Sequence, residues 1–250
     1  MKALILAAGY GTRLHPLTQD RAKPLLPIAG RRIIDTLVEQ LDRIAEIDRI
    51  HVVTNERFAA AFEDWSRAAG TATPITIIND KTTSNADRLG GIGDMHFAVQ
   101  AAAIDDDLLV AGGDQVYTFD FGELVRFYRA HGSSVALHRV GDPELVRRYS
   151  EVRLDEHARI VEFREKPAEP KYDLCAACLY VYRPEHAALL GDYLAAGENP
   201  DAPGYFAGWL HSRVELYGYE FPGAWYDIGD IAVYEEADRF FTERARNQAK

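Results

Sequence analysis

Short apolar runs alternate along the chain with segments in which apolar residues recur every three or four positions. The first kind, as at 49–54, fits a buried strand, and the second, as at 31–47, fits a helix with one apolar face. Strands are predicted at 3–8, 49–54, 75–79, 108–111, 134–139, 151–154, 160–163, 174–182 and 216–220, and helices at 31–47, around 58–65, and at 90–104, 121–131, 184–195, 205–214 and 231–246. This alternation predicts an α/β fold, a mixed and mostly parallel sheet with helices on both faces that binds ligands at the carboxyl ends of its strands.

The segment that follows the first strand suits an anion. Gly9 and Gly11 let the backbone turn tightly, and the successive N–H groups of such a turn attract negative charge. Arg13 adds a fork of donors and Lys23 a mobile charge, with Pro24 fixing where the lysine leaves the chain. The third glycine of the dinucleotide fingerprint and the Gly-Lys-Ser/Thr ending of the Walker loop are both missing. These residues together predict a pocket for a polyphosphate.

The string LAAGYGTRLHPLT, followed by AKPLLPI, resembles the opening of the sugar-nucleotide pyrophosphorylases, or NDP-sugar synthases. These nucleotidyltransferases join a nucleoside triphosphate to a sugar 1-phosphate. The resemblance implies a Rossmann-like fold of the nucleotide-diphospho-sugar transferase type, Mg²⁺ as cofactor, and the short form without a C-terminal hexapeptide-repeat domain. It also implies a single domain over 1–250, with a nucleotide-binding half at 1–135, a sugar-phosphate-binding half at 136–230 and a C-terminal helix at 231–250.

Composition and charge narrow the possible partners. The chain has 250 residues and a formal net charge of −11, which disfavours nucleic-acid binding because that binding depends on neutralised phosphates. Apolar runs stay well short of the ~20 residues that span a bilayer. The first strand follows Met1 directly, without a signal-peptide preamble, so we expect a cytoplasmic protein with no membrane partner. Cys175 and Cys178 lie within a predicted strand and lack a second cysteine pair, which favours buried thiols over a redox or zinc site.

Residues 79–94 form a long polar connection of the kind that is usually functional. Its glycine-rich end, 90–94, opens a predicted helix whose free N–H groups would point towards the strand ends. In the resembling family this segment recognises the nucleobase through a Gly-Leu-Ala-Gln-Ala-like motif, from which this chain departs, so the base stays open. A plain surface loop with a helix cap is the alternative. The predicted nucleotide-binding residues are Leu6, Ala8, Gly9, Gly11, Thr12, Arg13, Lys23, Asn85, Gly91 and Asp94.

Two aspartates are candidate metal ligands. Asp114 follows a buried strand and two glycines, where a carboxylate suits either a hard cation such as Mg²⁺ or the cap of the next helix. The resemblance, through the family's Leu-x-Gly-Asp motif, implies the metal. WYDIG at 225–229 is similar to the family's W-x-D-x-G and implies Asp227 as the second ligand, while Asp230 replaces the usual threonine and is expected to cap a helix. The predicted catalytic residues are Arg13, Lys23, Asp114 and Asp227, of which Asp114 and Asp227 bind metal.

The acceptor half carries a third motif. FREKP at 163–167 matches the family's F-x-E-K-P, which implies Lys166 on the acceptor phosphate and Glu165 on sugar hydroxyls. Ser150 and Cys178 stand where the family usually has glycine, which indicates that the acceptor differs from an ordinary hexose phosphate. The predicted sugar-phosphate-binding residues are Gly113, Ser150, Glu165, Lys166 and Cys178.

The implied reaction is attack of a sugar 1-phosphate on the α-phosphorus of a nucleoside triphosphate, with loss of pyrophosphate. Arg13 and the amides of 9–11 would hold the β- and γ-phosphates, and Lys23 the α-phosphate. Positioning and charge neutralisation then carry the catalysis, because the attacking group is already an anion.

Other functions are compatible with parts of the sequence. A cytidylyltransferase for phosphocholine or another non-sugar phosphomonoester shares the opening motif, and its quaternary ammonium would need an aromatic enclosure. The candidates for that enclosure are Tyr149, Tyr180, Tyr205, Trp209 and Tyr226. A non-catalytic nucleotide sensor is disfavoured by the simultaneous presence of the charged residues, and a glycosyltransferase would need Asp-x-Asp where this chain has a single acid. Relatives often associate, so a homo-oligomer is left open.

Overall fold

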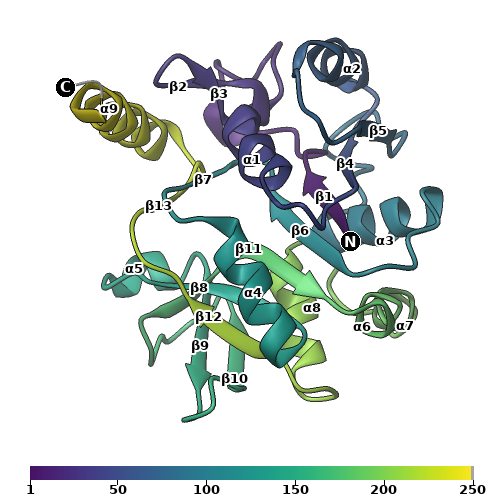
Figure 1. Cartoon of the computed structure of the whole chain (residues 1–250), viewed down its shortest axis with the longest axis vertical. Coiled ribbons are helices and arrows are strands. Elements are labelled where there is room, and N and C mark those ends of the chain that lie inside the picture. Colours follow the sequence, from purple (N-terminus) through teal and green to yellow (C-terminus); the bar gives the residue numbers. More distant parts are fainter. Residues whose placement is uncertain (249–250) are drawn as a thin grey trace.

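A seven-stranded sheet forms the centre of the computed structural model, which describes residues 1–248 (Figure 1). The strands lie in the order β12-β8-β11-β6-β1-β4-β5. β11 runs antiparallel to both of its neighbours, and the other pairs are parallel, which confirms the mixed, mostly parallel sheet. The strands of this sheet are β1 (Lys2–Leu6), β4 (Arg49–Thr54), β5 (Ile75–Asn79), β6 (Leu108–Gly112), β8 (Ser134–Arg139), β11 (Leu174–Tyr182) and β12 (Tyr217–Glu220).

Helices cover both faces of the sheet, as the alternating pattern predicts. Side chains alternate across a strand, so in β1 Ala3 and Ile5 join one core and Leu4 joins the other. The first core includes α1 (Ile33–Asp42), α2 (Ala59–Ala68) and α4 (Phe121–His131). The second includes α3 (Gly91–Ala101), α6 (Pro184–Ala187), α7 (Leu190–Ala195) and α8 (Pro203–Leu210).

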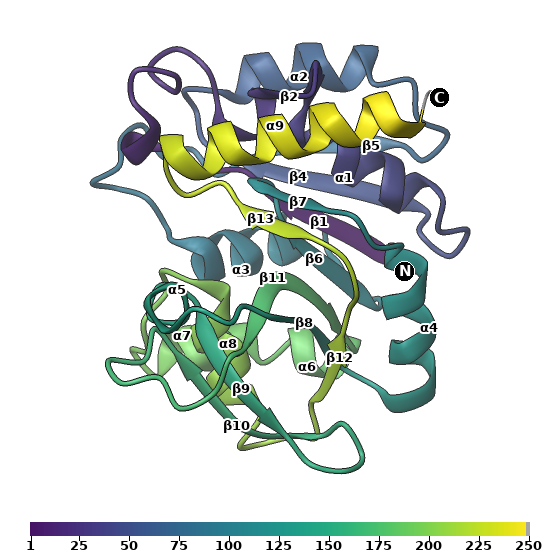
Figure 2. The ribbon, with the colours of Figure 1, turned by 90° about the vertical axis from the view of Figure 1, so that its left-hand side faces the viewer.

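Three small sheets flank the large one. β2 (Pro27–Ile28) pairs with β3 (Arg31–Arg32), and β9 (Ser150–Leu154) pairs with β10 (Ile160–Glu165), preceded by the short α5 (Pro143–Val146). β7 (Gln115–Tyr117) pairs with β13 (Trp225–Asp227), which leads into α9 (Ile231–Gln248). Figure 2 shows α9 lying across the front of the molecule above β13 and β7. A third core, which includes Leu14, Ile28, Val116 and Ala237, fixes this helix to the amino-terminal half.

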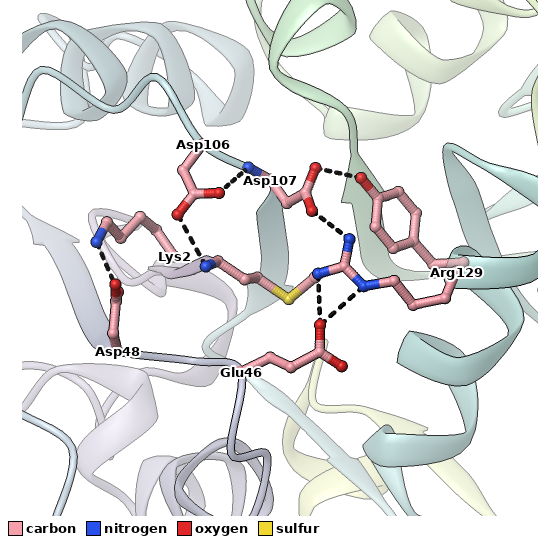
Figure 3. Close-up of polar contacts among 8 residues, drawn as sticks. Lys2, Glu46, Asp48, Asp106, Asp107 and Arg129 are labelled. Carbon is pink, nitrogen blue, oxygen red and sulfur yellow. Dashed lines mark hydrogen bonds and ion pairs between the residues drawn. The ribbon is translucent and has the colours of Figure 1, made fainter.

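Charged groups tie the amino end of β1 to its surroundings (Figure 3). The buried amino group of Met1 lies 2.8 Å from Asp106, and Lys2 pairs with Asp48 at 2.6 Å. Arg129 of α4 bridges Glu46 and Asp107, so that four segments meet at the edge of the sheet opposite to the carboxyl ends of its strands. This network supports the sheet and lies away from the residues that the motifs single out.

Several predicted boundaries are wrong. The helix predicted at 31–47 ends at Asp42. Ile44 and Ile47 lie in turns beyond it but are buried at a spacing of three, which extended the apolar pattern past the helix end. The helix predicted at 184–195 breaks at 188–189, and the one at 205–214 spans Pro203–Leu210. Strands β7 and β13 were not predicted, because three residues are too few to show an alternation of apolar and polar positions. Residues 249–250 of the predicted C-terminal helix lie outside the described residues. Within residues 1–248, no helix is both long and apolar enough to cross a membrane.

Candidate active site

The carboxyl ends of β1 and β6 lie side by side and carry the first two motifs. Gly113 N–H donates to the carbonyl of Leu6 at 2.9 Å, which continues the pairing of the two strands. A Cβ at residue 113 would stand 2.7 Å from that carbonyl and 3.1 Å from Pro24 Cγ. Only glycine therefore lets the chain that carries Asp114 pass so close to β1.

The glycine loop after β1 leaves space for a ligand. Gly11 adopts φ +62°, and its carbonyl accepts a hydrogen bond from Thr18 Oγ1 at 2.7 Å. A Cβ at Gly9 would meet no heavy atom within 4 Å, and Gly9, Thr12 and Arg13 are exposed. Ala8 is buried and its carbonyl is occupied by Asn55 Nδ2 at 2.8 Å, so it supports the loop from beneath. Backbone and guanidinium donors of this loop are thus free to meet an anion.

Lys23 and Asp114 form an ion pair between the two motifs. Lys23 Nζ lies 2.6 Å from Asp114 Oδ2, although 91 residues separate them. Lys23 opens a short 3₁₀ turn, Lys23–Leu25, in which Pro24 takes the second position. The lysine side chain is largely buried and that of the aspartate is about one-third exposed, so the pair faces solvent through its carboxylate.

Asp227 reaches the same place through the small β7–β13 sheet. Asp227 is the register partner of Gln115, and Ile228 N–H donates to the carbonyl of Asp114 at 3.1 Å. Burial raises the pKa of Asp227, and the charge of Asp114 raises it further, against the opposing effect of Lys23, Arg13 and Arg148. The structure therefore places the four predicted catalytic residues close enough for their charges to interact, and we call this set the charged group: Arg13, Lys23, Asp114 and Asp227.

Glu165 and Lys166 approach this group from the other half of the molecule. Burial raises the pKa of Glu165 to about 7, with Asp227 among the charges that act on it. The carboxylate of Glu165 packs against Gly204 at the start of α8, where a side chain would collide with it. Lys166 adopts φ +48°, and its Nζ lies 5.9 Å from the centre of the Tyr205 ring. A neutralisable acid and an exposed cation thus stand next to each other on the acceptor side.

The two residues that depart from the family pattern differ in accessibility. Ser150 is 1% exposed, and its hydroxyl accepts the N–H of Ala176 in β11 at 2.9 Å, so it lies behind the site. Cys178 is half-buried, with Sγ 3.2 Å from where a Cβ of Gly112 would stand. Burial raises the pKa of its thiol, followed by the charges of Asp114 and Asp227. Both cysteines are free thiols. Cys175 is buried, as predicted, whereas Cys178 is only half-buried, and its raised pKa keeps the thiol neutral beside the acids.

The predicted opening of α3 needs a correction. Gly91 and Ile92 were expected to present free N–H groups, but they donate to the carbonyls of Asp201 (2.7 Å) and Pro200 (2.9 Å). The loop between α7 and α8 folds over this helix end, and a Cβ at Gly90 would stand 2.5 Å from the carbonyl of Pro200. The helix end is therefore already capped by protein and does not offer these two donors to a nucleotide.

Asp94 and Asn85, the other candidates in this region, have different environments. Asp94 is buried beside Asp80, and burial, followed by the Asp80 charge, raises its pKa to about 8. Asp80 follows β5 and accepts the N–H of Thr82 at 2.7 Å, while Thr82 in turn contacts the Tyr10 hydroxyl at 3.3 Å. Asn85 lies in the exposed part of the loop, where its carbonyl accepts from Arg88. Their predicted roles in nucleotide binding stay predictions.

Arg148 joins the group without a signal in the sequence, through a contact with Asp230. Asp230 caps α9 as expected, with Val233 N–H at 3.0 Å, and its second carboxylate oxygen accepts from Arg148 at 3.0 Å. Arg148 reads in the sequence as part of a charged surface run, and its distance of 82 residues from Asp230 hides the pair. Only the folded chain shows that it stands beside Asp227.

Metal binding would depend on two carboxylates. Among residues 1–248 no three His, Cys, Asp or Glu side chains gather as a metal site. Asp114 and Asp227 are hard oxygen donors. Burial, followed by the charge of Asp114, raises the pKa of Asp227, and a nearby cation would oppose both effects. One or two carboxylates completed by phosphate oxygens and water are the usual protein contribution to a Mg²⁺ site. The residues therefore fit the ion.

Comparison with known proteins identifies the family and the fold of the chain. Residues 2–244 match the family described as nucleotidyl transferase. The fold is similar to a crystal structure described as a glucose-1-phosphate thymidylyltransferase from Bacillus anthracis in complex with sucrose, with a TM-score of 0.84, 23% identity and coverage of 97% of this chain and 95% of that one. It is also similar to a UDP-glucose pyrophosphorylase complexed with UDP-glucose, with a TM-score of 0.82, 21% identity and coverage of 97% and 98%. The chain therefore belongs to the nucleotidyl transferase family.

Proposed function

We propose that the protein transfers a nucleotidyl group from a nucleoside triphosphate to a sugar 1-phosphate and releases pyrophosphate. The observation that carries this proposal is the gathering of Arg13, Lys23, Asp114 and Asp227 at the carboxyl edge of the sheet, with Glu165 and Lys166 beside them. Such a group suits a reaction between two polyanions, whose repulsion is the main obstacle. The sugar-nucleotide activity described for the two similar structures points in the same direction.

In this reaction an oxygen of the acceptor phosphate bonds to the α-phosphorus, and the bond from that phosphorus to the oxygen bridging to the β-phosphorus breaks. The electron pair leaves with pyrophosphate, so no strong general base is required. Arg13 and the exposed loop at Gly9 would hold the β- and γ-phosphates, and Lys23 the α-phosphate. Lys166 would hold the acceptor phosphate, and Glu165 would accept hydrogen bonds from the hydroxyl groups of the sugar. Asp114 and Asp227 would hold Mg²⁺, which when bound supplies positive charge to the reacting phosphates.

A phosphocholine acceptor loses its main support, because the five candidate aromatic side chains do not form one enclosure. Tyr180 is buried against Tyr182, and Tyr226 packs on Phe240 and Phe241 of α9. The remaining three are Tyr149, which packs on Trp225, Trp209, which stacks with Phe206, and Tyr205, which lies beneath Lys166. A lysine already beside the Tyr205 ring disfavours a second cation there.

The test is pyrophosphate release over a panel of nucleoside triphosphates and phosphomonoesters, with Mg²⁺ and with EDTA. Asp114→Asn and Asp227→Asn should each lower the rate on the order of 10²–10³-fold, the range for removing a preorganised electrostatic group. Asp105→Asn, the same change at an exposed acid before the amino end of β6, is the matched control. Wild-type rates in both site variants, or release that needs no phosphomonoester, would contradict the proposal.

A further inference from the structure

Two arginines from opposite halves of the chain converge on Gly229. Where a Cβ of Gly229 would stand, Arg148 Nη2 is 3.2 Å away and Arg13 Nη1 is 3.8 Å away. Gly229 follows the half-buried Asp227 by two residues. Two guanidinium groups this close repel each other unless anions lie between them. Asp227 and Asp230 supply some of that negative charge, and a bound phosphate would supply more.

Arg148 belongs to the acceptor side of this group. Tyr149, the next residue, accepts the N–H of Lys166 at its carbonyl at 2.6 Å, and Ser150 is the register partner of Glu165. The segment that carries Arg148 therefore runs alongside the segment that carries Glu165 and Lys166. Arg13 and Lys23, by contrast, come from the loop after β1. The site thus has two cations on each side, and only Lys166 on the acceptor side was visible as a motif.

The present partner of Arg148 is weak enough to be exchanged. Its ion pair with Asp230 is monodentate at 3.0 Å, and the two side chains are 41% and 36% exposed. Half-exposed pairs of this kind contribute little stability. A phosphate can take a guanidinium through two parallel hydrogen bonds, which a single carboxylate oxygen does not match. Asp230 keeps its bond to Val233 N–H whichever partner Arg148 takes.

We propose that Arg148 binds the phosphate of the acceptor, and that Asp230 holds the arginine beside Asp227 until that phosphate arrives. This inference rests on the proposed function for the nature of its ligand. It adds a second acceptor-phosphate cation to Lys166 and gives Asp230, which replaces the family's threonine, a task besides capping α9.

Equilibrium binding measured by calorimetry tests the inference without turnover. The probes are inorganic phosphate, pyrophosphate and a nucleoside triphosphate, titrated into wild type, Arg148→Ala, Asp230→Asn and Arg147→Ala. Arg147 is the matched control, since it is the adjacent arginine and pairs only with Glu144, at 3.6 Å, among the described residues. Arg148→Ala should weaken phosphate binding about 10- to 100-fold, the value of one charge-assisted contact, and change triphosphate binding less than about 2-fold. Asp230→Asn still caps α9 and should leave phosphate binding unchanged or tighten it.

Four results would overturn the inference. The first is equal phosphate binding in Arg148→Ala and in wild type, and the second is no phosphate binding by wild type. The third is a loss in Asp230→Asn as large as that in Arg148→Ala, which would make the pair a rigid support instead of an exchangeable contact. The fourth is a larger loss of pyrophosphate binding than of phosphate binding in Arg148→Ala, because Arg148 would then serve the leaving group and not the acceptor. These outcomes are separate from failure of the proposed function, which would appear as absent pyrophosphate release with phosphate binding intact.

Discussion

The buried pair of Asp80 and Asp94 should make the stability of the protein fall as the pH rises. Burial and the Asp80 charge raise the pKa of Asp94 from 3.8 to about 8. The unfolded chain therefore releases this proton near pH 4, whereas the folded chain keeps it until about pH 8. Between these values the folded state binds more protons, so its free energy of unfolding decreases with increasing pH. Asp94→Asn has no proton to release and should remove this dependence.

The magnitude follows from the shift. Each pKa unit corresponds to 1.36 kcal/mol, so the three pH units from 5 to 8 give about 4 kcal/mol as an upper bound. Asp94 keeps a small exposed fraction, 7%, and local relaxation lowers the cost of its charge. We therefore expect the free energy of unfolding of Asp94→Asn, measured relative to wild type, to rise by about 2 kcal/mol from pH 5 to pH 8.

Urea unfolding at a series of pH values between 5 and 9 measures this difference directly. Asp64→Asn, a change at an exposed acid of α2, is the matched control and should follow wild type at every pH. Parallel curves for wild type and Asp94→Asn would refute the reasoning, because they would show that Asp94 ionises as readily in the folded protein as in the unfolded chain.

Two further predictions concern stability, and they join the tests of Asp114, Asp227 and Arg148. Gly113→Ala should destabilise the fold by about 1–3 kcal/mol, because its Cβ would stand 2.7 Å from the Leu6 carbonyl. A Cβ at Gly9 meets nothing within 4 Å, so the control variant Gly9→Ala should have a melting temperature within about 1 °C of wild type. A low melting temperature in both variants, or in neither, would contradict this. Arg129→Ala should cost about 1 kcal/mol, since it breaks the bridge between Glu46 and Asp107, while Arg126→Ala on the same helix loses only an exposed contact of 4.0 Å to Glu123. Equal denaturation midpoints for the two arginine variants would show that the Arg129 bridge does not stabilise the protein.

The periodic elements were within reach of the sequence because their causes are local. The strands at 49–54, 75–79, 134–139 and 174–182 and the helix at 121–131 have the predicted bounds, since each is defined by its own apolar period and by flanking breakers. The boundaries failed at Asp42 and at 188–189, where buried residues continue at a spacing of three through turns. The local pattern therefore did not mark either helix end.

The residues of the site also fall into two kinds, those that a motif marked in the sequence and those that only the fold revealed. The motifs marked Arg13, Lys23, Asp114, Asp227, Glu165 and Lys166 as chemistry-bearing residues, because each stands in a string whose spacing is distinctive. The free helix end at Gly91 was a wrong prediction, since the carbonyls that occupy it come from residues more than 100 positions away. Arg148 and Asp80 had no distinctive neighbours in the sequence, and their importance depends on Asp230 and Asp94, which only folding brings to them.

Hydrophobic periods and short motifs act over a few residues, so the alternating strands and helices, the sheet type and the family could all be predicted from the order of the residues. Which charges lie close together depends on the folded chain. Strands β7 and β13 are three residues long and more than 100 positions apart, and their pairing sets Asp227 beside Asp114. Coulomb interactions depend on distance in space and on burial, and neither can be read from the order of the residues.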